Sequence, residues 1–233
     1  MIAVVIPTRN TNYVPPCYNG IPTLVVYDDQ KKGFAKTCNQ GLATIQSQNI
    51  RWAVICNDDA HITQENLELL IAEIDVHTGV IAPTIISDQK IQSAGISVSS
   101  WGRVLLRRSI QKKQPDALSG ACFLIPSWVR FDDGYLHGFE DIALCSFVKN
   151  RGLSLNLVSS AICEHQSGGT LPHYTRDWYA LSLYGQLRFF SKSRYVPLIL
   201  CMAIAQKNID IEGLKGIWQG FSMWKNHRFF TVT

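Results

Sequence analysis

Two adjacent acids, Glu140 and Asp141, stand at the head of a run with helical periodicity. In the stretch HGFEDIALCSFVKNRG, apolar residues recur at helical spacing at Ile142, Cys145 and Val148, and a glycine follows the run. Acids in a first helical turn complement the helix dipole, so the pair could simply cap the helix. A carboxylate there could also accept a proton from a reacting group. The rest of the chain has to decide between these roles.

Three more polar clusters each follow a short apolar run that reads as a buried strand. They are Pro7-Thr8-Arg9-Asn10, Asp28-Asp29 and Asn57-Asp58-Asp59. In parallel α/β sheets, ligands bind beyond the carboxyl ends of the strands. Each cluster could also be only a polar turn. Acids on neighbouring strand ends would repel one another without a cation or donors between them, and this favours a metal site.

The elements that would position these clusters alternate between strands and helices, which predicts a parallel sheet covered on both faces. Strands are expected at Ile2–Ile6, Thr23–Tyr27, Trp52–Cys56, Gly79–Ala82, Ala117–Ile125 and Leu153–Val158. Helices are expected at Ala35–Gln46, Gln64–Asp75 and Asp141–Asn150, and the pattern is helical from Tyr174 onward. The basic stretch 97–115 predicts a mobile loop or hairpin.

The length and composition of the chain limit the kinds of protein that it can be. A chain of 233 residues with 46% hydrophobic and 17% charged residues can form a substantial core and is not disordered. The seven cysteines include no C-x-x-C pair and mostly lie in apolar runs, which favours free thiols in a reducing compartment. The N-terminus lacks a signal-peptide pattern, and no apolar stretch is long enough to span a membrane. We therefore expect a cytoplasmic protein.

The net charge of +4 is unevenly placed. Residues 173–233 carry eight Lys or Arg against three Asp or Glu, and twelve of the 24 aromatic residues. Their apolar run Tyr195–Ala205 is too short to span a bilayer and is flanked by Lys192, Arg194 and Lys207. This pattern predicts a peripheral contact with the inner face of the plasma membrane or with a lipid-linked acceptor. A helical cap on the core, or a dimer contact, is the alternative.

Several familiar classes can be set aside. Neither G-x-G-x-x-G nor G-x-x-x-x-G-K-[ST] is present, which argues against a dinucleotide oxidoreductase and a P-loop protein. The Gly-rich loop of a sugar nucleotidyltransferase is also missing after the first strand. A nucleic-acid partner would rest on the basic tail alone, and interfacial helices have the same composition, so none is expected.

Seven segments together resemble the family 2 glycosyltransferases of GT-A fold, especially their rhamnosyltransferase-like bacterial members. They occur in the family's order and are VVIPTRN (4–10), VVYDD (25–29), GFAKTCNQGL (33–42), AVICNDDA (53–60), SGACFLIP (119–126), FDDGYLHGFEDIAL (131–144) and EHQSGG (164–169). The tail also resembles the family's C-terminal helices. The resemblance implies a Rossmann-like α/β fold with a mostly parallel mixed sheet flanked by helices. It implies a GT-A catalytic domain at 1–172, with nucleotide-binding and acceptor parts at about 1–60 and 80–172, and a helical appendage at 173–233.

The resemblance further implies an inverting glycosyltransferase, of hexosyltransferase type, in polysaccharide biosynthesis. It would move a sugar from a nucleoside diphosphate donor, a UDP- or dTDP-sugar, to a hydroxyl of a glycan or lipid-linked acceptor. Asp141 matches the family's general base, and Glu140 beside it would orient the acceptor or the surroundings of Asp141. The expected nucleotide-binding residues are Pro7, Thr8, Arg9, Asp28, Gly33, Phe34, Asn39 and Asp58.

For the metal, the resemblance places Asn57-Asp58-Asp59 at the D-x-D motif and makes His165 the residue that completes the shell. Asp59, His165 and Asn57 are thus the expected ligands, with Asp59 the more direct carboxylate because the first motif position is an asparagine. An imidazole ligand suits Mn²⁺ better than Mg²⁺. A core histidine is the alternative for His165. Gly168 and Gly169 could turn backbone N–H groups toward a phosphate.

The sequence also departs from the family in its nucleotide half. The segment TNYVPPCYNGIP between the first two strands cannot be the usual helix, because it holds three prolines. Only Gln30, Lys31 and Lys32 separate VVYDD from the GFA loop, where the family inserts a helix and a strand. A non-catalytic relative that binds a nucleotide sugar or a glycan therefore stays open as the alternative function. The sequence specifies no sugar, acceptor or oligomeric state.

Overall fold

The computed structural model describes residues 1–99, 102–166, 175–190, 196–204 and 209–227. These residues form two compact units, which are described separately. The sheet unit comprises Met1–Ser97, Leu105–Asp133 and Glu140–Ser167. The helical unit comprises Val98–Val104, Gly134–Phe139 and Gly168–Thr233. Val98–Val104 and Gly134–Phe139 thus belong to the helical unit although they precede its main segment in the chain.

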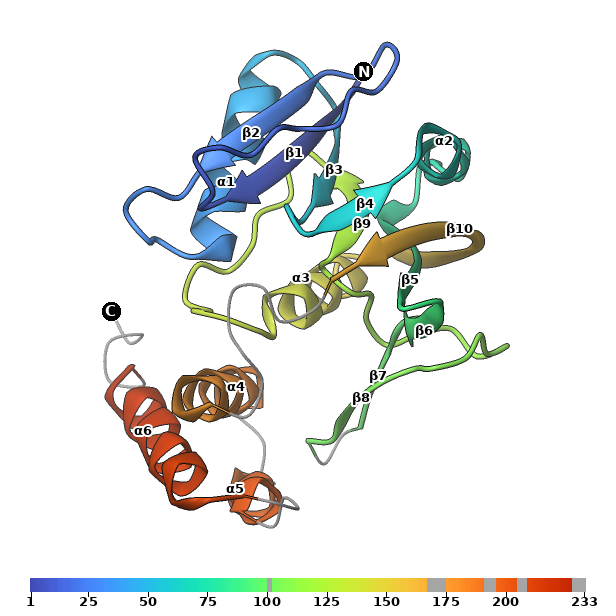
Figure 1. The fold of residues 1–233 in the computed structure, drawn as a ribbon. Coiled ribbons are helices and arrows are strands. Elements are labelled where there is room, and N and C mark those ends of the chain that lie inside the picture. The colour runs from blue at the N-terminus through green and yellow to red at the C-terminus, as the bar shows by residue number, and fades with distance from the viewer. Residues whose placement is uncertain (100–101, 167–174, 191–195, 205–208, 228–233) are drawn as a thin grey trace. The chain divides into compact units, whose positions relative to one another are not determined.

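The sheet unit is built on one eight-stranded sheet of order β2-β1-β3-β9-β5-β10-β4, with β6 paired to β5 (Figure 1). β1, β2, β3, β5 and β10 run in one direction, and β4, β6 and β9 run in the other. The predicted α/β class with a mixed, mostly parallel sheet is therefore confirmed. The strands are β1 (Ile2–Thr8), β2 (Thr23–Tyr27), β3 (Trp52–Cys56), β4 (Ala60–Ile62), β5 (Thr78–Ser87), β6 (Lys90–Ser93), β9 (Cys122–Pro126) and β10 (Ser154–His165).

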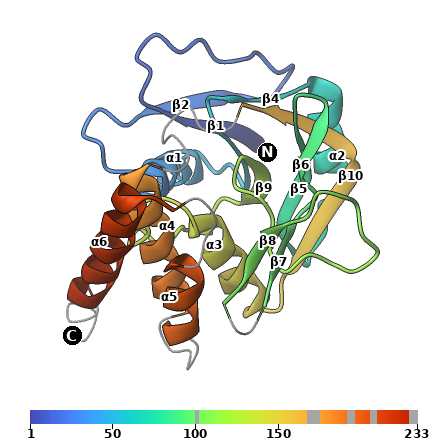
Figure 2. The same cartoon turned by 60° about the horizontal axis from the view of Figure 1, so that its bottom comes forward.

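Helices cover both faces of this sheet (Figures 1 and 2). Val4 and Ile6 of β1 belong to a core cluster with Leu67 and Leu70 of α2 (Gln64–Ala72). The opposite face holds α1 (Phe34–Ser47) and α3 (Glu140–Lys149). There the fit is close, because a Cβ on Gly41 of α1 would lie 2.4 Å from Cγ1 of Val5. Central strands buried on both faces explain why their sequences are continuous apolar runs.

The predicted strands and helices are present, but several bounds differ: β9 begins at Cys122 instead of Ala117, and α2 ends at Ala72 instead of Asp75. β5 and β10 continue several residues beyond the predicted ranges, and β4 and β6 were not predicted. These pieces contain polar residues such as His61, Gln92 and Glu164, so they lack the apolar continuity that marks the central strands. The chain between β1 and β2 contains no helix, as expected from its prolines.

Part of the basic stretch 97–115 forms regular structure, and residues 100 and 101 lie outside the described residues. β7 (Ile96–Val98) and β8 (Val104–Leu106) pair as a two-stranded sheet, which agrees with the predicted hairpin. Arg107 is buried at 5% exposure. Its guanidinium donates to Oγ of Ser97 and to the carbonyl oxygens of Lys113 and Gln114. One of the basic residues thus ties the segment down instead of facing a ligand.

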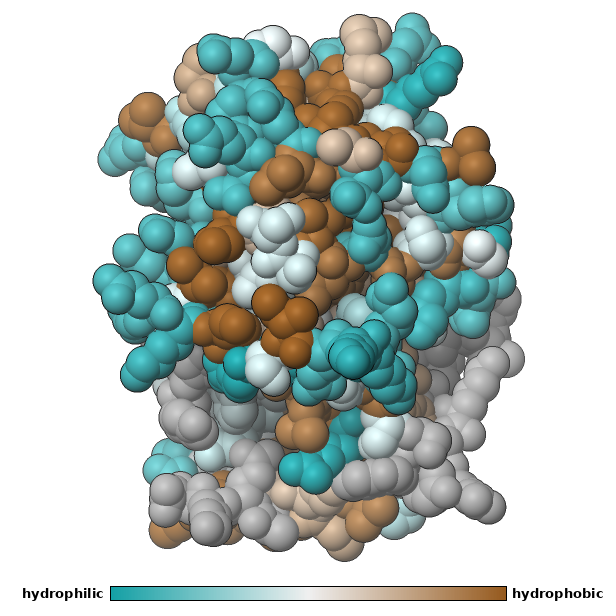
Figure 3. All heavy atoms as spheres, turned by 90° about the vertical axis from the view of Figure 1, so that its right-hand side faces the viewer, coloured by the Kyte–Doolittle hydropathy of each residue, from teal (hydrophilic) through white to brown (hydrophobic). Residues whose placement is uncertain are grey.

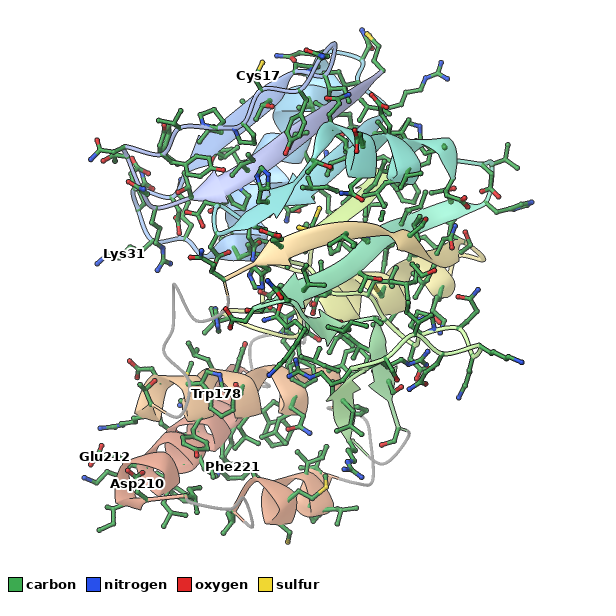
Figure 4. The ribbon with its side chains drawn as sticks, turned by 45° about the vertical axis from the view of Figure 1, so that its right-hand side comes forward. Cys17, Lys31, Trp178, Asp210, Glu212 and Phe221 are labelled. Carbon is green, nitrogen blue, oxygen red and sulfur yellow. The ribbon has the colours of Figure 1, made fainter. Side chains whose placement is uncertain are left out.

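The helical unit contains α4 (Arg176–Phe189), α5 (Val196–Ile204) and α6 (Ile211–His227), as the sequence pattern predicted. α6 packs closely on α4 through glycines: a Cβ on Gly216 would lie 2.3 Å from the carbonyl oxygen of Arg176, and one on Gly220 would lie 2.3 Å from that of Ala180. Trp178 of α4 and Phe221 of α6, labelled in Figure 4, pack against the core of this unit. None of the helices in the described ranges has the length and hydropathy to cross a membrane.

The amino-terminal end of α6 is capped by an acid. Oδ1 of Asp210 accepts a hydrogen bond from the backbone N–H of Gly213 at 2.7 Å. Figure 4 shows Asp210 and Glu212 together at this helix end, where negative charge complements the helix dipole. These acids therefore have a local structural role.

The surface of the sheet unit mixes both kinds of side chain. In the upper part of Figure 3, hydrophobic side chains (brown) reach the surface within a hydrophilic (teal) surround. Leu69 of α2 and Ile162 of β10 are two of the exposed large hydrophobic residues in this unit. Scattered exposure of this kind is common in folded proteins and does not by itself indicate a binding site.

Candidate active site

The predicted base and the predicted metal ligands meet at one edge of the sheet. The backbone N–H of Asn57, just after β3, donates to the carbonyl oxygen of Ala121 at 2.9 Å. The preceding residue, Gly120, donates its N–H to Oδ2 of Asp141 at 2.9 Å. A Cβ on Gly120 would lie 3.0 Å from Cβ of Asp141, so a bulkier residue would crowd this approach. The antiparallel pairing of β9 with β3 thus brings together groups that are far apart in sequence.

The two acids at the start of α3 have different surroundings. Glu140 is 9% exposed, and its Oε2 has no hydrogen-bond partner among the described residues. Burial, together with the neighbouring charge of Asp141, raises the pKa of Glu140 to about 8. Glu140 is therefore mostly neutral at pH 7.

The carboxylate of Asp141, unlike that of Glu140, accepts hydrogen bonds from backbone N–H groups. Burial raises its pKa, while the N–H groups of Gly120 and Ile142 oppose that shift; Ile142 donates to Oδ1 at 2.8 Å. The helix dipole favours the ionised form of an acid in the first turn, but the desolvation of Asp141 outweighs this effect and raises its pKa. A raised pKa makes Asp141 a stronger base once ionised, and a neutral Glu140 does not repel that charge.

Asp28 organises the loop after β2. Its Oδ1 accepts the N–H of Lys32 at 2.6 Å, and its Oδ2 accepts the N–H of Gly33 and Nε of Arg9, each at 3.1 Å. Burial would raise the pKa of Asp28, but these donors outweigh it and hold the pKa below its ordinary value. Lys31, labelled in Figure 4, lies on the same loop. Gly33 has a φ of 95°, a backbone conformation that favours glycine before α1.

The other predicted nucleotide-binding residues divide into two groups. Thr8 donates its hydroxyl to Asp58 and accepts the N–H of Asn10, so the ends of β1 and β3 are joined at this edge. Arg9 leaves about half of its side chain exposed, at 49%. Pro7 is buried in β1 opposite Val26.

Phe34 and Asn39 of α1 instead contact the chain after β9. Asn39 donates through Nδ2 to the carbonyl oxygen of Phe131 at 2.9 Å and accepts its N–H through Oδ1 at 2.8 Å. The Phe34 ring meets the Phe131 ring edge-on, with centroids 5.6 Å apart. The structure gives both residues a supporting role, and their contact with a nucleotide stays a prediction.

The predicted metal ligands lie close together. Oδ1 of Asp59 is 3.1 Å from Nε2 of His165, and both side chains are mostly buried. The backbone N–H of Gln166 donates to the carbonyl oxygen of Asp59 at 3.0 Å, which joins the end of β10 to this loop. Oδ1 of Asn57 is buried without a hydrogen-bond partner among the described residues. The Asp59–His165 pair and the unpartnered oxygen of Asn57, two residues before Asp59 in the chain, are groups of the kind that a divalent cation binds.

The spacing of these groups also fits. Neighbouring ligands of an octahedral ion at about 2.1 Å from the metal are about 3 Å apart, close to the Asp59–His165 separation. The described residues hold no group of three His, Cys, Asp or Glu that could bind a metal by themselves. The remaining ligands would have to be the Asn57 oxygen, water and donor phosphates. Gly168 and Gly169 lie outside the described residues.

Sequence reasoning missed Gln92, which contacts His165 in this site. Its Oε1 lies 2.9 Å from Nδ1 of His165. A hydrogen bond from Nδ1–H leaves Nε2 directed at Asp59 and orients the ring, as outer partners of metal-bound histidines do. Because Gln92 lies on the short polar strand β6, no periodicity or motif marks it in the sequence.

Comparisons with known proteins support the fold. No protein-family profile and no curated protein sequence matches this chain. Among solved structures it is similar to a mannosyltransferase, PcManGT from Pyrobaculum calidifontis, in complex with GDP-Man and Mn²⁺, with 11% identity, a TM-score of 0.52, and coverage of 99% of this chain and 83% of that one. It is also similar to TarS from S. aureus, with 15% identity, a TM-score of 0.48, and coverage of 99% and 72%. At 11% identity, the similarity to the mannosyltransferase shows the fold alone, which is the GT-A-like architecture.

Proposed function

We propose that this chain is an inverting glycosyltransferase of family 2 that moves a sugar from a nucleoside diphosphate donor to a hydroxyl of a glycan or lipid-linked acceptor. The observation that carries the proposal is one connected path at the sheet edge. Asp141 bonds Gly120, and the next residue, Ala121, bonds Asn57, two residues before Asp59. The candidate base and the acidic strand end are thus linked through two neighbouring residues, Gly120 and Ala121, in a GT-A-like fold. Either feature alone would be weaker support.

Asp141 would act as the general base. As the acceptor oxygen attacks the anomeric carbon, the acceptor O–H proton passes to the Asp141 carboxylate, and the bond from that carbon to the diphosphate oxygen breaks on the opposite face. Attack from the opposite face inverts the anomeric centre. The N–H groups of Gly120 and Ile142 hold the carboxylate in place. The buried neutral Glu140 supports Asp141 without competing for the proton.

Asp59, His165 and Asn57 would hold a divalent cation, Mn²⁺ in preference to Mg²⁺ because of the imidazole. When bound, such an ion supplies Lewis-acid stabilisation of the charge that develops on the leaving diphosphate. Gln92 would keep the His165 ring oriented.

The nucleoside diphosphate of a UDP- or dTDP-sugar would lie beyond β1 and β2. Arg9 offers a half-exposed cation there, and in the loop from Asp28 to Gly33 the backbone N–H groups of Lys32 and Gly33 are held by the Asp28 carboxylate. The hydrogen bond from Thr8 to Asp58 connects the end of β1 to the loop that carries Asn57 and Asp59. Pro7, Phe34 and Asn39 would line or support the pocket.

The helical unit would face a membrane surface or a lipid-linked acceptor. Ile211, Leu214 and Trp218 recur along one side of α6 and are 72%, 43% and 71% exposed, while its glycines pack on α4. Apolar and aromatic side chains of this kind suit the bilayer interface, where basic residues add affinity for anionic lipid. Flotation with anionic liposomes tests this contact, and its absence at low salt would favour a helical cap. The flanking Lys192, Arg194 and Lys207 lie outside the described residues.

The decisive test of the function is turnover. The purified chain is incubated with UDP-, dTDP- and GDP-sugars and Mn²⁺, with and without candidate acceptors, and released nucleoside diphosphate is measured. Acceptor-dependent release that disappears in excess chelator supports the proposal. Tight binding of a nucleotide sugar or glycan with no release, in the presence of every acceptor tested, would favour the non-catalytic alternative.

A further inference from the structure

Three thiols lie together in the core of the sheet unit. Cys56 is the last residue of β3, Cys122 is the first residue of β9, and Cys163 belongs to β10. They are 2%, 0% and 0% exposed and belong to one core cluster. Their side chains interact with one another. All three are free thiols, and the proposed transfer reaction uses none of them.

Cys56 and Cys122 lie directly opposite one another in the antiparallel register of β3 and β9. The next pair along the strands is hydrogen-bonded, because the N–H of Asn57 donates to the carbonyl oxygen of Ala121 at 2.9 Å. Hydrogen-bonded and non-hydrogen-bonded pairs alternate along an antiparallel ladder, so the two cysteines form a non-hydrogen-bonded pair. The Cα atoms of such a pair are about 4.5 Å apart, inside the range of about 4.4–6.8 Å that a disulfide spans.

This cysteine pair adjoins the link between the candidate metal ligands and the candidate base. Cys56 immediately precedes Asn57, and Cys122 immediately follows Ala121. The hydrogen bond between Asn57 and Ala121, and the one from the neighbouring Gly120 to the base, are therefore next to the two thiols in the chain. A covalent bond between the thiols would act on the backbone that holds this link.

We propose that Cys56 and Cys122 form a reversible disulfide in the presence of peroxide, and that this bond weakens metal binding at the candidate site. A disulfide imposes a fixed geometry on the ends of β3 and β9, which free thiols do not, and so shifts Asn57. Disulfides inside cells are usually transient and redox-sensing. The effect on metal binding and transfer rests on the proposed function, whereas formation of the bond does not.

The reaction balances with hydrogen peroxide as the oxidant. One thiol sulfur attacks a peroxide oxygen, the O–O bond breaks, and a sulfenic acid forms with release of one water. The second sulfur then attacks the sulfenic sulfur, the S–S bond forms, and hydroxide leaves with the second thiol proton as another water. Two thiols are oxidised and one peroxide is reduced. A small thiol such as glutathione reverses the bond by exchange, being oxidised to its own disulfide while both cysteines regain their protons.

Burial controls the rate of this oxidation. Peroxide reaches the closed pair when the strand ends open locally. Such opening is favoured by position, because Cys56 and Cys122 are terminal residues of their strands and the partly exposed Asn57 follows β3. An ion held by Asn57, Asp59 and His165 would oppose the opening. Mn²⁺ should therefore slow the oxidation, and chelator should accelerate it.

The test uses the full chain with Cys17→Ser and Cys201→Ser, because these two cysteines are exposed and would react first. Cys17 is labelled in Figure 4. This protein is treated with hydrogen peroxide in Mn²⁺ or in chelator, and its intact mass and non-reduced peptides are measured by mass spectrometry. We expect a loss of two hydrogen atoms, one cross-linked peptide pair that joins Cys56 to Cys122, and full recovery with glutathione.

Two other cysteines are internal controls in the same protein. Cys38 and Cys145 are each 0% exposed, as Cys122 is, but no thiol contacts either of them among the described residues. They should stay reduced. Oxidation of these controls at the rate of Cys56 and Cys122 would mean that unfolding of the whole domain, and not the pairing of thiols, determines the reaction.

The consequence for the site is measured on the same samples. Oxidation should lower Mn²⁺ affinity about 10- to 100-fold, as when the support of a metal ligand is lost, and turnover should fall with it. Cys56→Ala and Cys122→Ala should each abolish the linkage and make Mn²⁺ affinity insensitive to peroxide. Absence of the linkage, a linkage through Cys163 instead, or a linkage that changes neither Mn²⁺ affinity nor turnover would overturn the proposal. The linkage is mapped with all three core cysteines present, so that result does not depend on whether the alanine variants fold.

Mass spectrometry also separates the switch from the proposed function. A chain that transfers no sugar, but forms the linkage and loses Mn²⁺ affinity on oxidation, would keep the switch and lose the transferase function. A chain that transfers sugar equally before and after peroxide, with no linkage, would keep the function and remove the switch.

Discussion

Asp28 and Glu140 are almost equally buried, at 8% and 9% exposure, yet their pKa values move in opposite directions. Asp28 accepts two backbone N–H groups and the Arg9 side chain, and its pKa is lowered. Glu140 has an unpartnered oxygen and an acidic neighbour, and burial raises its pKa to about 8. Because burial disfavours the charged form of both acids, the comparison shows that donors aimed at a carboxylate can outweigh that cost, and that a buried carboxyl without them keeps its proton. One acid stabilises a loop as an anion, and the other stays neutral beside the candidate base.

The largest effect is expected at the base. Asp141→Asn keeps the size of the side chain and removes its basicity, so kcat should fall about 10²- to 10⁴-fold while donor affinity changes little. Glu140→Gln is the matched control, because amide and neutral acid are similar in shape. It should retain most of the turnover at pH 7. Similar losses for both variants, or near-normal turnover of Asp141→Asn, would remove the distinction between the two acids.

A comparable loss is expected when the metal ligands are changed. Asp59→Ala and His165→Ala should each remove most activity and weaken Mn²⁺-dependent donor binding, measured by calorimetry with and without chelator. Gln92→Ala should cost less, about 10- to 100-fold in metal affinity, because it acts through the orientation of His165. Donor binding that stays the same in chelator and in both ligand variants would argue against the metal site.

The neutral state of Glu140 predicts an unusual dependence of stability on pH. The unfolded acid loses its proton near pH 4.5, while the folded one keeps it to about pH 8. The folded state therefore binds more protons between these values, and stability falls as the pH rises, by up to about 1.4 kcal/mol per pH unit. Glu140→Gln should remove this slope and stabilise the protein at pH 8 relative to the wild type. Denaturant unfolding at pH 5 to 8 measures it, and parallel profiles would contradict the assignment.

Asp28 should respond in the opposite sense and by less. Its lowered folded pKa contributes stability that is present above pH 3.8 and is lost as the pH falls through the folded value. Asp28→Asn should therefore lower the free energy of unfolding by about 1–3 kcal/mol at pH 7, because hydrogen bonds to a charged group are lost. This loss of stability should become smaller below pH 3.8. Thermal unfolding at pH 7 and pH 3 checks this. A penalty that is the same at both values would mean that charge is not what Asp28 contributes.

Much of the fold could be predicted from local pattern. The bounds of β2 and β3 match the predicted ranges, and α1 and α3 begin within a residue of theirs. Local pattern sufficed here because a doubly covered strand needs an unbroken apolar run and a surface helix needs a periodic one. The polar clusters after the first and third strands also reach a shared edge, where Thr8 bonds Asp58.

The sequence by itself thus determined which residues are available for chemistry and roughly where each strand and helix lies. Only the tertiary structure decided how they combine. The antiparallel insertion of β9 beside β3 brings Ala121 to Asn57, next to the Gly120 N–H that bonds Asp141, and the extension of β10 along β4 brings His165 to Asp59. Non-local strand pairing leaves no trace in local periodicity. The protonation state of Glu140 could not be predicted from the sequence either. An acid at the start of a helix is expected to be ionised, and only the surrounding fold shows how strongly it is desolvated.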